Sequence, residues 1–252
     1  TSELSTTPSK FTNYTQIFRN TWAISDSARA TQVIAGETNV AENKQDCAAF
    51  HAADIEKAIF FGQKSTGSRN GQPFRTMDGL INLVEPNASA NTNAAGATTT
   101  YAQLETMLDP VFDQVTDPKG GNERLLFVGS GALTVINNIG KLYGIYQIVD
   151  GATDFGLQFR TFRTTRGTFR MVEHPLLNSN SVWKKMAIAV DLATFNLAYL
   201  GDRKTQHKEF NADADANDNG IDAVGGTLTT ELTTVCKNPS ACAVITNLTA
   251  AA

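Results

Sequence analysis

Alternating polar and large side chains near the start of the chain predict an extended β-hairpin. Residues 1–10 are polar and show no period, so we expect them to form an arm. From residue 13 onward every second side chain falls on one face of a strand: Tyr14, Gln16, Phe18, Asn20, Trp22 and Ile24. Residues 25–28 (SDSA) have turn composition, and residues 29–36 (RATQVIAG) are again β-prone. A two-stranded hairpin is marginal alone, so it needs a further surface to pack on.

A helical period replaces this alternation after residue 38. Apolar and small side chains recur along one stripe: Cys47, His51, Ile55, Ala58 and Gly62. Asn39 and Glu42 have the spacing of a capping box, and Gly62 suits a helix end. The predicted helix over residues 39–64 is about 37 Å long, which is longer than usual in a compact domain.

The middle of the chain alternates short helices with loops. We expect an open polar loop at 65–74 and a surface loop of small residues at 87–100. Residues 101–115 predict a helix that stops near Pro110. Residues 123–144 predict a strand, a glycine turn and a helix.

β-patterns dominate the C-terminal half of the chain. Residues 145–190 include a predicted hairpin around TTRG (164–167). We also expect a strand pair at 185–201 and a closing hairpin of residues 227–235 with 241–248. One long helix, a few shorter ones and mainly antiparallel strands together predict the α+β class.

Composition affects the expected surface and partners. Of the 252 residues, 41% are apolar and 18% are charged, so neutral polar side chains must cover much of the surface. The formal net charge of −4 gives no electrostatic reason to expect tight binding to a nucleic-acid backbone. No apolar run approaches the length of a membrane-spanning helix.

The three cysteines are scattered. Cys47 lies on the helical stripe and is expected to be a buried thiol. Cys236 and Cys242 flank the turn KNPSA, so their thiols are placed to approach each other, and whether they pair is left open. Without a paired cysteine framework, a reducing compartment is the better expectation.

Residues 213–222 (DADANDNGID) begin like a calcium-binding loop. Asp215, Asn217 and Asn219 alternate, and Gly220 follows. The position that requires a bidentate carboxylate holds Gly226, however, and the flanking sequence does not predict a pair of helices. We therefore expect a solvated turn and no metal site.

The remaining motifs carry no convincing catalytic chemistry. Gly129 and Gly131 follow a strand pattern, as in a dinucleotide fingerprint, but Thr134 stands where the third glycine belongs. The glycines are expected to allow a tight turn into a helix, and a nucleotide-binding enzyme that uses them is a remote alternative. The histidines at 51, 174 and 207 have no zinc-site spacing. We expect no enzyme, no catalytic or metal-binding residue and no cofactor.

Ordered blocks over residues 11–248 resemble the major capsid proteins of tailed bacteriophages. The blocks are FTNYTQIFRNTWAISDSARATQVIAG, ENKQDCAAFHAADIEKAIFFG, RTMDGLINLV, ATDFGLQFRTFRT, AVDLATFNLAYLGDRKTQHK and GGTLTTELTTVCKNPSACAVITNL. The resemblance implies the HK97 capsid fold. On that fold the chain would be divided into an N-terminal arm (1–12), an extended loop (13–36), a first part of the peripheral domain (37–99) with a spine helix at 39–64, a mainly axial part (100–178) and a return to the peripheral domain (179–252).

The same resemblance implies a mechanical function. Copies of the chain would form hexamers and pentamers that close into an icosahedral virion shell around packaged double-stranded DNA, with diffuse DNA contact. Portal and decoration proteins are further implied partners, no membrane is involved, and assembly takes place in the host bacterial cytoplasm. An encapsulin-like cellular compartment of the same fold is the alternative.

The extended loop is expected to supply contacts between subunits. The candidates are Tyr14, Phe18, Arg19, Trp22, Ile24 and Arg29. The alternative is that the aromatic side chains pack on their own domain. Residues 13–36 contain no lysine, so non-covalent locking is expected instead of lysine cross-linking. Deleting residues 1–36 is accordingly expected to leave a soluble subunit that no longer closes into particles.

Overall fold

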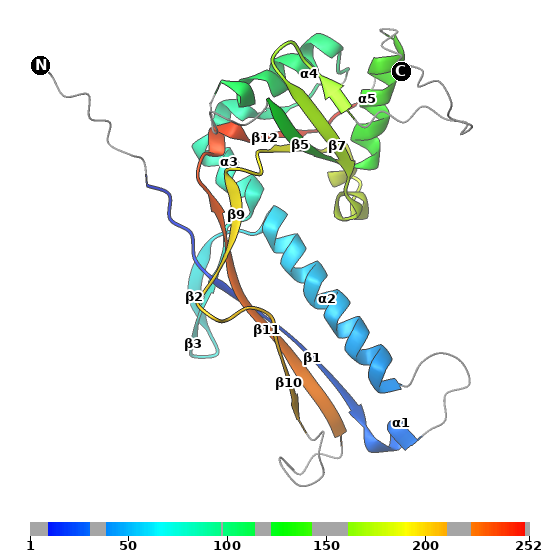
Figure 1. The fold of residues 1–252 in the computed structure, drawn as a ribbon, viewed down its shortest axis with the longest axis vertical. Coiled ribbons are helices and arrows are strands. Elements are labelled where there is room, and N and C mark those ends of the chain that lie inside the picture. Colours follow the sequence, from blue (N-terminus) through cyan, green and yellow to red (C-terminus); the bar gives the residue numbers. More distant parts are fainter. Residues whose placement is uncertain are drawn as a thin grey trace, which may run out of the picture. The chain divides into compact units, whose positions relative to one another are not determined.

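The computed structural model describes residues 10–30, 39–96, 98–113, 122–142, 161–210 and 223–249. The chain divides into two compact units (Figure 1). Unit 1 consists of Thr1–Gly79 and Leu197–Thr234, and unit 2 of Leu80–Asn196 and Val235–Ala252. Both units combine helices with strands, as the α+β class predicts. The division of the chain into peripheral and axial domains stays a prediction.

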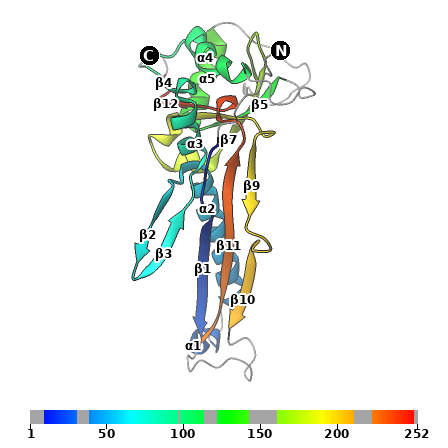
Figure 2. The same ribbon diagram turned by 90° about the vertical axis from the view of Figure 1, so that its left-hand side faces the viewer.

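A four-stranded sheet is the frame of unit 1 (Figure 2). Strand β1 (Gln16–Ser25) pairs antiparallel with β11 (Ala223–Cys236) along its whole length. Strand β10 (Gln206–Phe210) pairs antiparallel with β11, and β9 (Phe195–Tyr199) also pairs with β11. The longest strand of the unit therefore lies in the middle, and β1 forms one edge.

The predicted hairpin over residues 13–36 is wrong in its pairing. The first strand exists and alternates as predicted, but its partner β11 comes from the far end of the chain. The residues after the strand form the short helix α1 (Asp26–Ala30), where the turn and the first two residues of the return strand were predicted. Residues 31–36 lie outside the described residues. A local pattern can predict a strand, but it does not say which distant segment pairs with it.

Helix α2 (Asn39–Phe61) confirms the predicted long helix and packs against β1. Phe18 of β1 joins Met77 and Leu232 in a small buried core. The helix adds three partly buried apolar side chains to this core: Ile55, Ala58 and Ile59. The inward face of β1 and the apolar stripe of α2 thus cover each other.

Two further strands of unit 1 form a hairpin by themselves. Strands β2 (Ser65–Arg69) and β3 (Gln72–Thr76) pair antiparallel around Asn70 and Gly71. Both turn residues have positive φ, 53° and 76°, as a type I′ turn requires. The prediction of an open polar loop is wrong here. The Asn-Gly pair carries the hairpin signal, but the flanking residues lack the apolar alternation that usually accompanies it.

A six-stranded sheet is the centre of unit 2. Its strands lie in the order β4 (Thr92–Ala94), β12 (Ala243–Thr246), β8 (Ala187–Val190), β5 (Glu123–Val128), β7 (Thr168–Glu173) and β6 (Thr161–Arg163). The helices of this unit are α3 (Leu80–Asn87), α4 (Tyr101–Leu108) and α5 (Ser130–Leu142). The buried core draws on helices and strands alike, with Leu104, Leu126, Val135, Phe169 and Ile245.

The pairings in unit 2 confirm one predicted hairpin and correct two others. Strands β6 and β7 pair antiparallel around residues 164–167, as predicted. Strands β8 and β9 are not a pair, because β8 joins β5 and β12 whereas β9 pairs with β11. Strands β11 and β12 likewise belong to different sheets. The predicted surface loop at 87–100 in fact supplies β4, which pairs with β12.

The glycine turn between β5 and α5 is present as predicted. A Cβ atom at Gly129 would lie 2.5 Å from the carbonyl oxygen of Lys184, and one at Gly131 would lie 3.0 Å from the same oxygen. The glycines therefore leave room for a neighbouring backbone segment. This supports the packing interpretation over the nucleotide-binding one.

Candidate assembly surfaces

Three of the six predicted contact residues are buried in unit 1. Phe18, Trp22 and Ile24 are at most 9% exposed and share the inward face of β1. The indole Nε1–H of Trp22 donates to Nε2 of His207 at 3.2 Å, and the two rings stack. These side chains stabilise their own subunit, which is the alternative interpretation of the pattern, so they are removed from the contact candidates.

Tyr14, Arg19 and Arg29 are exposed and stay contact candidates. The Tyr14 side chain is 40% exposed, and the ammonium group of Lys64 lies 6.0 Å from its ring centre. Arg29 forms an ion pair with Asp26 within α1, at 3.2 Å. The exposed set therefore begins just before β1 and continues along its outward face to the short helix that follows.

A groove of about 400 Å³ lies between β1 and α2. Its lining includes Ile17 and Arg19 from the strand and Asp54, Lys57 and Phe61 from the helix. In the described part of the sheet β1 pairs only with β11, so it is an edge strand among the described strands. Such an edge can pair with a strand of another chain.

Few side chains of helix α2 are buried. Among its described side chains, Cys47, His51 and Phe60 are the buried ones, although the helix has 23 residues. Phe50 is 65% exposed. Most of the helix surface is therefore available to another subunit.

The β2–β3 hairpin is an exposed ribbon of unit 1 (Figure 2). Every side chain of β2 is exposed, and so is every side chain of β3 except that of Thr76. Phe74 is 42% exposed, and Arg69 and Arg75 give the ribbon positive charge. Sequence reasoning missed this surface, and the Asn-Gly turn is the signal that could have found it.

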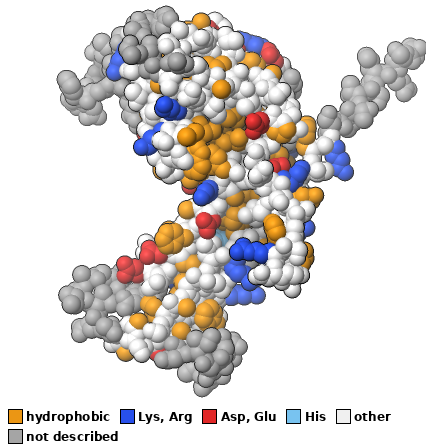
Figure 3. Space-filling view, turned by 180° about the vertical axis from the view of Figure 1, so that it is seen from behind, with side chains coloured by type: hydrophobic (Ala, Val, Ile, Leu, Met, Phe, Trp, Pro, Cys, Tyr) orange, Lys and Arg blue, Asp and Glu red, His pale blue; other side chains and the backbone are white. Residues whose placement is uncertain are grey.

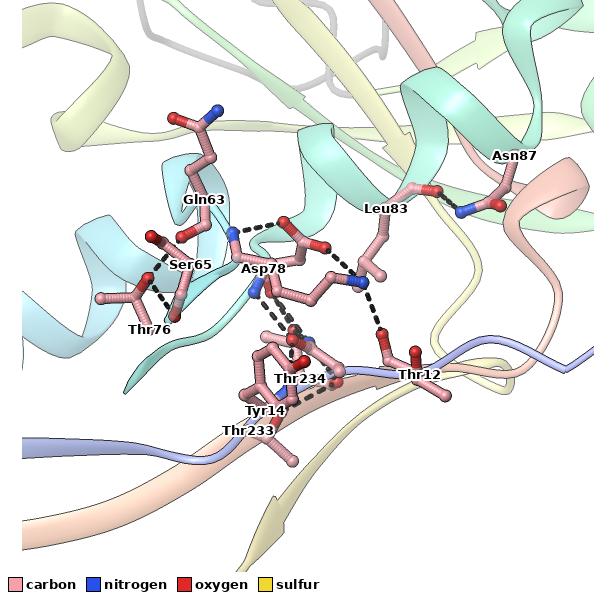
Figure 4. Close-up of polar contacts among 12 residues, drawn as sticks. Thr12, Tyr14, Gln63, Ser65, Thr76, Asp78, Leu83, Asn87, Thr233 and Thr234 are labelled. Carbon is pink, nitrogen blue, oxygen red and sulfur yellow. Dashed lines mark hydrogen bonds and ion pairs between the residues drawn. The ribbon is translucent and has the colours of Figure 1, made fainter. Parts of the chain in front are cut away.

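A cluster of hydrogen bonds holds the segment just before β1 in place (Figure 4). The side-chain amide of Asn13 donates to the backbone carbonyls of Asp78 at 3.1 Å and Thr234 at 3.0 Å. The backbone N–H of Asp78 donates back to the Asn13 side-chain oxygen at 2.8 Å. The Lys64 ammonium donates to the Thr12 carbonyl at 2.9 Å. These bonds hold the incoming segment against the end of β11 and the residues that flank the hairpin.

A buried carboxylate supports the base of the same hairpin. Glu231 of β11 is 1% exposed and accepts a hydrogen bond from the Thr15 hydroxyl at 2.9 Å. Arg75 of β3 and Arg203 each approach the carboxylate to 3.2 Å. Because a buried carboxylate needs partners to offset its lost hydration, this cluster holds the hairpin base, the start of β1 and β11 together.

His51 links α2 to two strands of the sheet. Its Nδ1 lies 2.7 Å from Oδ1 of Asn20 on β1, and its Nε2 lies 2.7 Å from the hydroxyl of Thr230 on β11. Burial lowers the pKa of His51, and the nearby Asp54 carboxylate opposes this effect only in part. The neutral ring therefore serves as a structural link between helix and sheet.

On the face shown in Figure 3, backbone and neutral polar side chains make up most of the described surface, and apolar side chains gather in patches among them. Most of the large hydrophobic side chains exposed in the described ranges belong to unit 1: Phe11, Tyr14, Ile17, Phe50, Phe74, Leu197, Tyr199 and Leu200. Within those ranges no group of three or more His, Cys, Asp and Glu side chains is arranged to hold a metal ion. The calcium-like stretch 213–222 lies outside them.

None of the described helices combines the length and the apolar character needed to cross a bilayer.

Solved shell proteins share this arrangement of elements. The holo-SrpI encapsulin complex from Synechococcus elongatus is similar with a TM-score of 0.57 and 9% identity, over 93% of this chain and 74% of that chain. A structure from Mycobacterium phage Bobi has the same TM-score, 0.57, and 10% identity, over 93% of this chain and 72% of that chain. The cyanophage Pam1 capsid asymmetric unit is similar with a TM-score of 0.54 and 13% identity, over 100% of this chain and 82% of that chain. The chain therefore has the HK97-type fold of phage capsid proteins and encapsulins, as predicted.

Sequence comparison identifies the family within this class. The model of the SU10 major capsid protein family matches residues 1–249, and the chain belongs to this family. The major capsid protein of Pseudomonas phage PaMx41 is 33% identical over 247 residues, which cover 94% of this chain. The chain spans 59% of the length of that relative. The predicted resemblance to phage major capsid proteins is confirmed.

Proposed function

We propose that this chain is the self-assembling subunit of a virion shell, with a structural and non-enzymatic role. The observation that carries the proposal is the family match over residues 1–249. Three features of unit 1 support it: a long helix with few buried side chains, a strand at the edge of the described sheet and an exposed hairpin. Surfaces of this kind are stabilised when other copies of the same chain cover them.

The β2–β3 hairpin takes over, in this proposal, the neighbour-contacting role first expected of residues 13–36. Its ten strand residues are nearly all exposed, whereas β1 is built into the sheet of its own unit. The Glu231 cluster and the Asn13 cluster hold the ribbon and the incoming segment at their bases. A ribbon held at its base can contact a neighbour without losing its position on its own subunit. Tyr14, Arg19 and Arg29 are the proposed contacts outside the hairpin.

The proposed shell consists of hexamers and pentamers and encloses double-stranded DNA. It is assembled in the host bacterial cytoplasm, with portal and decoration proteins as further partners. Contact with DNA is diffuse in this proposal, because the net charge of −4 offers no strong attraction to phosphates. Packing of DNA then depends on confinement by the shell and not on tight binding to each subunit.

An encapsulin-like compartment is the second candidate function. The similarity to the SrpI encapsulin complex, with a TM-score of 0.57, favours it. The family match favours the virion shell. The two candidates differ in their contents, because a virion holds a genome and a cellular compartment of this kind holds enzyme cargo.

Electron microscopy and content analysis test the proposal together. We expect the purified protein to form closed particles of uniform size in negative stain, and particles released from infected cells to protect DNA from nuclease. Particles that contain protein cargo and no genome would support the compartment instead. A protein that stays monomeric at every concentration tested would contradict both candidates.

A further inference from the structure

Two thiols lie together at the point where the last two strands of the chain meet a tight turn. Cys236 is the last residue of β11, and Cys242 directly precedes β12. Both are free and buried, at 8% and 0% exposure. Their side chains share a hydrogen bond, so the two sulfur atoms are already neighbours. The remaining thiol, that of Cys47, belongs to α2 in unit 1.

The turn between the two cysteines is held firmly in place. The 3-10 turn Pro239–Ala241 is capped by Asn238, whose side chain accepts from the N–H of Ser240 at 3.2 Å. The N–H of Cys242 donates to the carbonyl of Pro239 at 3.0 Å. The buried amide of Asn91 donates to the carbonyls of Ser240 at 2.7 Å and Cys242 at 3.0 Å. The backbone of the loop that carries the two thiols is therefore held in place by hydrogen bonds at several points.

The two thiols differ in acidity in the way that a reactive pair requires. The hydrogen bond from Cys242 lowers the pKa of Cys236, although burial opposes the effect. The same hydrogen bond and burial raise the pKa of Cys242 well above its ordinary value. Cys236 is thus the thiol that more readily forms a thiolate and attacks an oxidant first. Burial raises the pKa of Cys47.

We propose that Cys236 and Cys242 form a reversible oxidation site, at which a small peroxide converts the neighbouring thiols into a disulfide that closes the ring 236–242. The bond would tie the end of β11 to the start of β12, an inner strand of the six-stranded sheet. Residues 239 and 241 inside the ring are buried, so the ring is fixed to the core of unit 2. The proposal concerns chemistry within one chain and does not depend on the proposed function.

The reaction balances with hydrogen peroxide as the oxidant. The Cys236 thiolate attacks one peroxide oxygen, the O–O bond breaks, and a sulfenic acid and hydroxide form. The Cys242 sulfur then attacks the Cys236 sulfur, the S–O bond breaks, and water leaves after taking up the Cys242 proton. Two thiols and one peroxide become one disulfide and two water molecules. A reducing thiol such as dithiothreitol reverses the change.

Peptide mapping tests the proposal on the unaltered chain, because Lys237 lies inside the ring. The native protein is treated with hydrogen peroxide, free thiols are blocked with N-ethylmaleimide during denaturation, and trypsin is added without reductant. Cleavage after Lys208 and Lys237 places Cys236 in peptide 209–237 and Cys242 in the peptide that starts at residue 238. We expect these two peptides to remain joined by a disulfide after peroxide treatment and to separate on reduction.

Variants provide the controls. Cys236→Ala and Cys242→Ala are each expected to abolish the linked product, while Cys47→Ala, which removes another buried thiol, is expected to retain it. Two separate, maleimide-blocked peptides from the oxidised native protein would overturn the proposal. So would a linked product that contains Cys47, or a product joined between chains on a non-reducing gel. The wild-type map gives an answer even if an alanine variant does not fold.

Discussion

In unit 1, buried or half-buried polar side chains hold segments of the chain together, a role that apolar side chains usually have. His51, Glu231 and Asn13 each join segments from distant parts of the chain, and each does so through two or more hydrogen bonds or ion pairs. The described apolar cluster between β1, α2 and β11 is small, with Phe18, Met77 and Leu232 as its buried members. Directional bonds therefore take a larger share in fixing which segments meet.

The lowered pKa of His51 makes the stability of unit 1 depend on pH. In the unfolded chain this histidine takes up a proton near its ordinary pKa of 6.5. In the folded chain burial lowers the pKa, so the ring takes up the proton only at a lower pH. The unfolded state thus binds more protons, and the contribution of His51, which is complete above pH 6.5, is lost as the pH falls towards the folded pKa. We expect the urea concentration at the midpoint of unfolding to decrease when the pH is lowered from 7.5 to 5.5.

A comparison of variants isolates the part that His51 contributes. His51→Gln is expected to show a smaller decrease of the urea midpoint between pH 7.5 and pH 5.5 than the wild-type protein. An equal fall in wild type and His51→Gln would show that other groups cause the pH dependence.

The burial pattern of β1 shows how far sequence reasoning reaches at the residue scale. Alternation placed Phe18, Trp22 and Ile24 on one face, and the structure confirms that face. The pattern did not decide whether the face meets a neighbour or the chain's own helix, because both surfaces are apolar. The sequence contains no pattern that predicts the hydrogen bonds of Asn13, because a single asparagine is also common in loops without such bonds.

At the scale of elements, α2 and the segment before α3 meet at a point where only glycine fits. The N–H of Gly79 donates to the carbonyl of Gly62 at 2.8 Å. A Cβ atom at Gly79 would lie 2.6 Å from the Gly62 nitrogen and 2.7 Å from the Ala58 oxygen, both backbone atoms that do not yield easily. The end of the helix is thereby fixed against the chain that leaves the β2–β3 hairpin.

Replacement of this glycine is expected to be costly. Gly79→Ala should lower the free energy of unfolding by about 1–3 kcal/mol, the usual cost of overpacking a tight contact. Urea unfolding followed by circular dichroism measures the change. Gly96→Ala is the matched control, because a Cβ atom there meets nothing within 4 Å, and little change is expected. Equal stabilities of the two variants would mean that the helix end moves aside freely.

Element predictions succeeded where the signal was local and failed where it was not. The period and the terminal glycine predicted α2 almost to its ends, and the short TTRG loop predicted β6 and β7. The partner of β1 and the separation of β11 from β12 were missed. Both depend on contacts between distant segments, for which several β-prone candidates competed in this chain.

At the scale of the whole molecule, the pairing of β1 changes which deletion tests assembly. Removing residues 1–36 also removes β1 and with it Phe18 and Trp22 from the interior of unit 1. That deletion is now expected to disrupt the fold, so loss of particles would not identify a contact surface. The exposed hairpin offers a cleaner change.

Shortening the β2–β3 hairpin is expected to separate folding from assembly. Deleting residues 67–68 and 73–74 keeps the Asn70-Gly71 turn with its closing pair of Arg69 and Gln72, the pair of Thr66 with Arg75, and the ion pair of Arg75 with Glu231. The variant should retain its circular dichroism spectrum and thermal midpoint, because the removed side chains are exposed. Sedimentation velocity and negative stain should show subunits or small oligomers in place of closed particles. Normal particles from a folded variant would remove the hairpin from the proposed contacts.

The partnership of β1 with β11 also sets an order of events during translation. Residues 16–25 leave the ribosome early, but their partner is complete only when residue 236 has been made. At about 5–20 residues per second the first strand waits roughly 10–40 s for the last. A polysome therefore carries nascent chains whose first unit is unfinished.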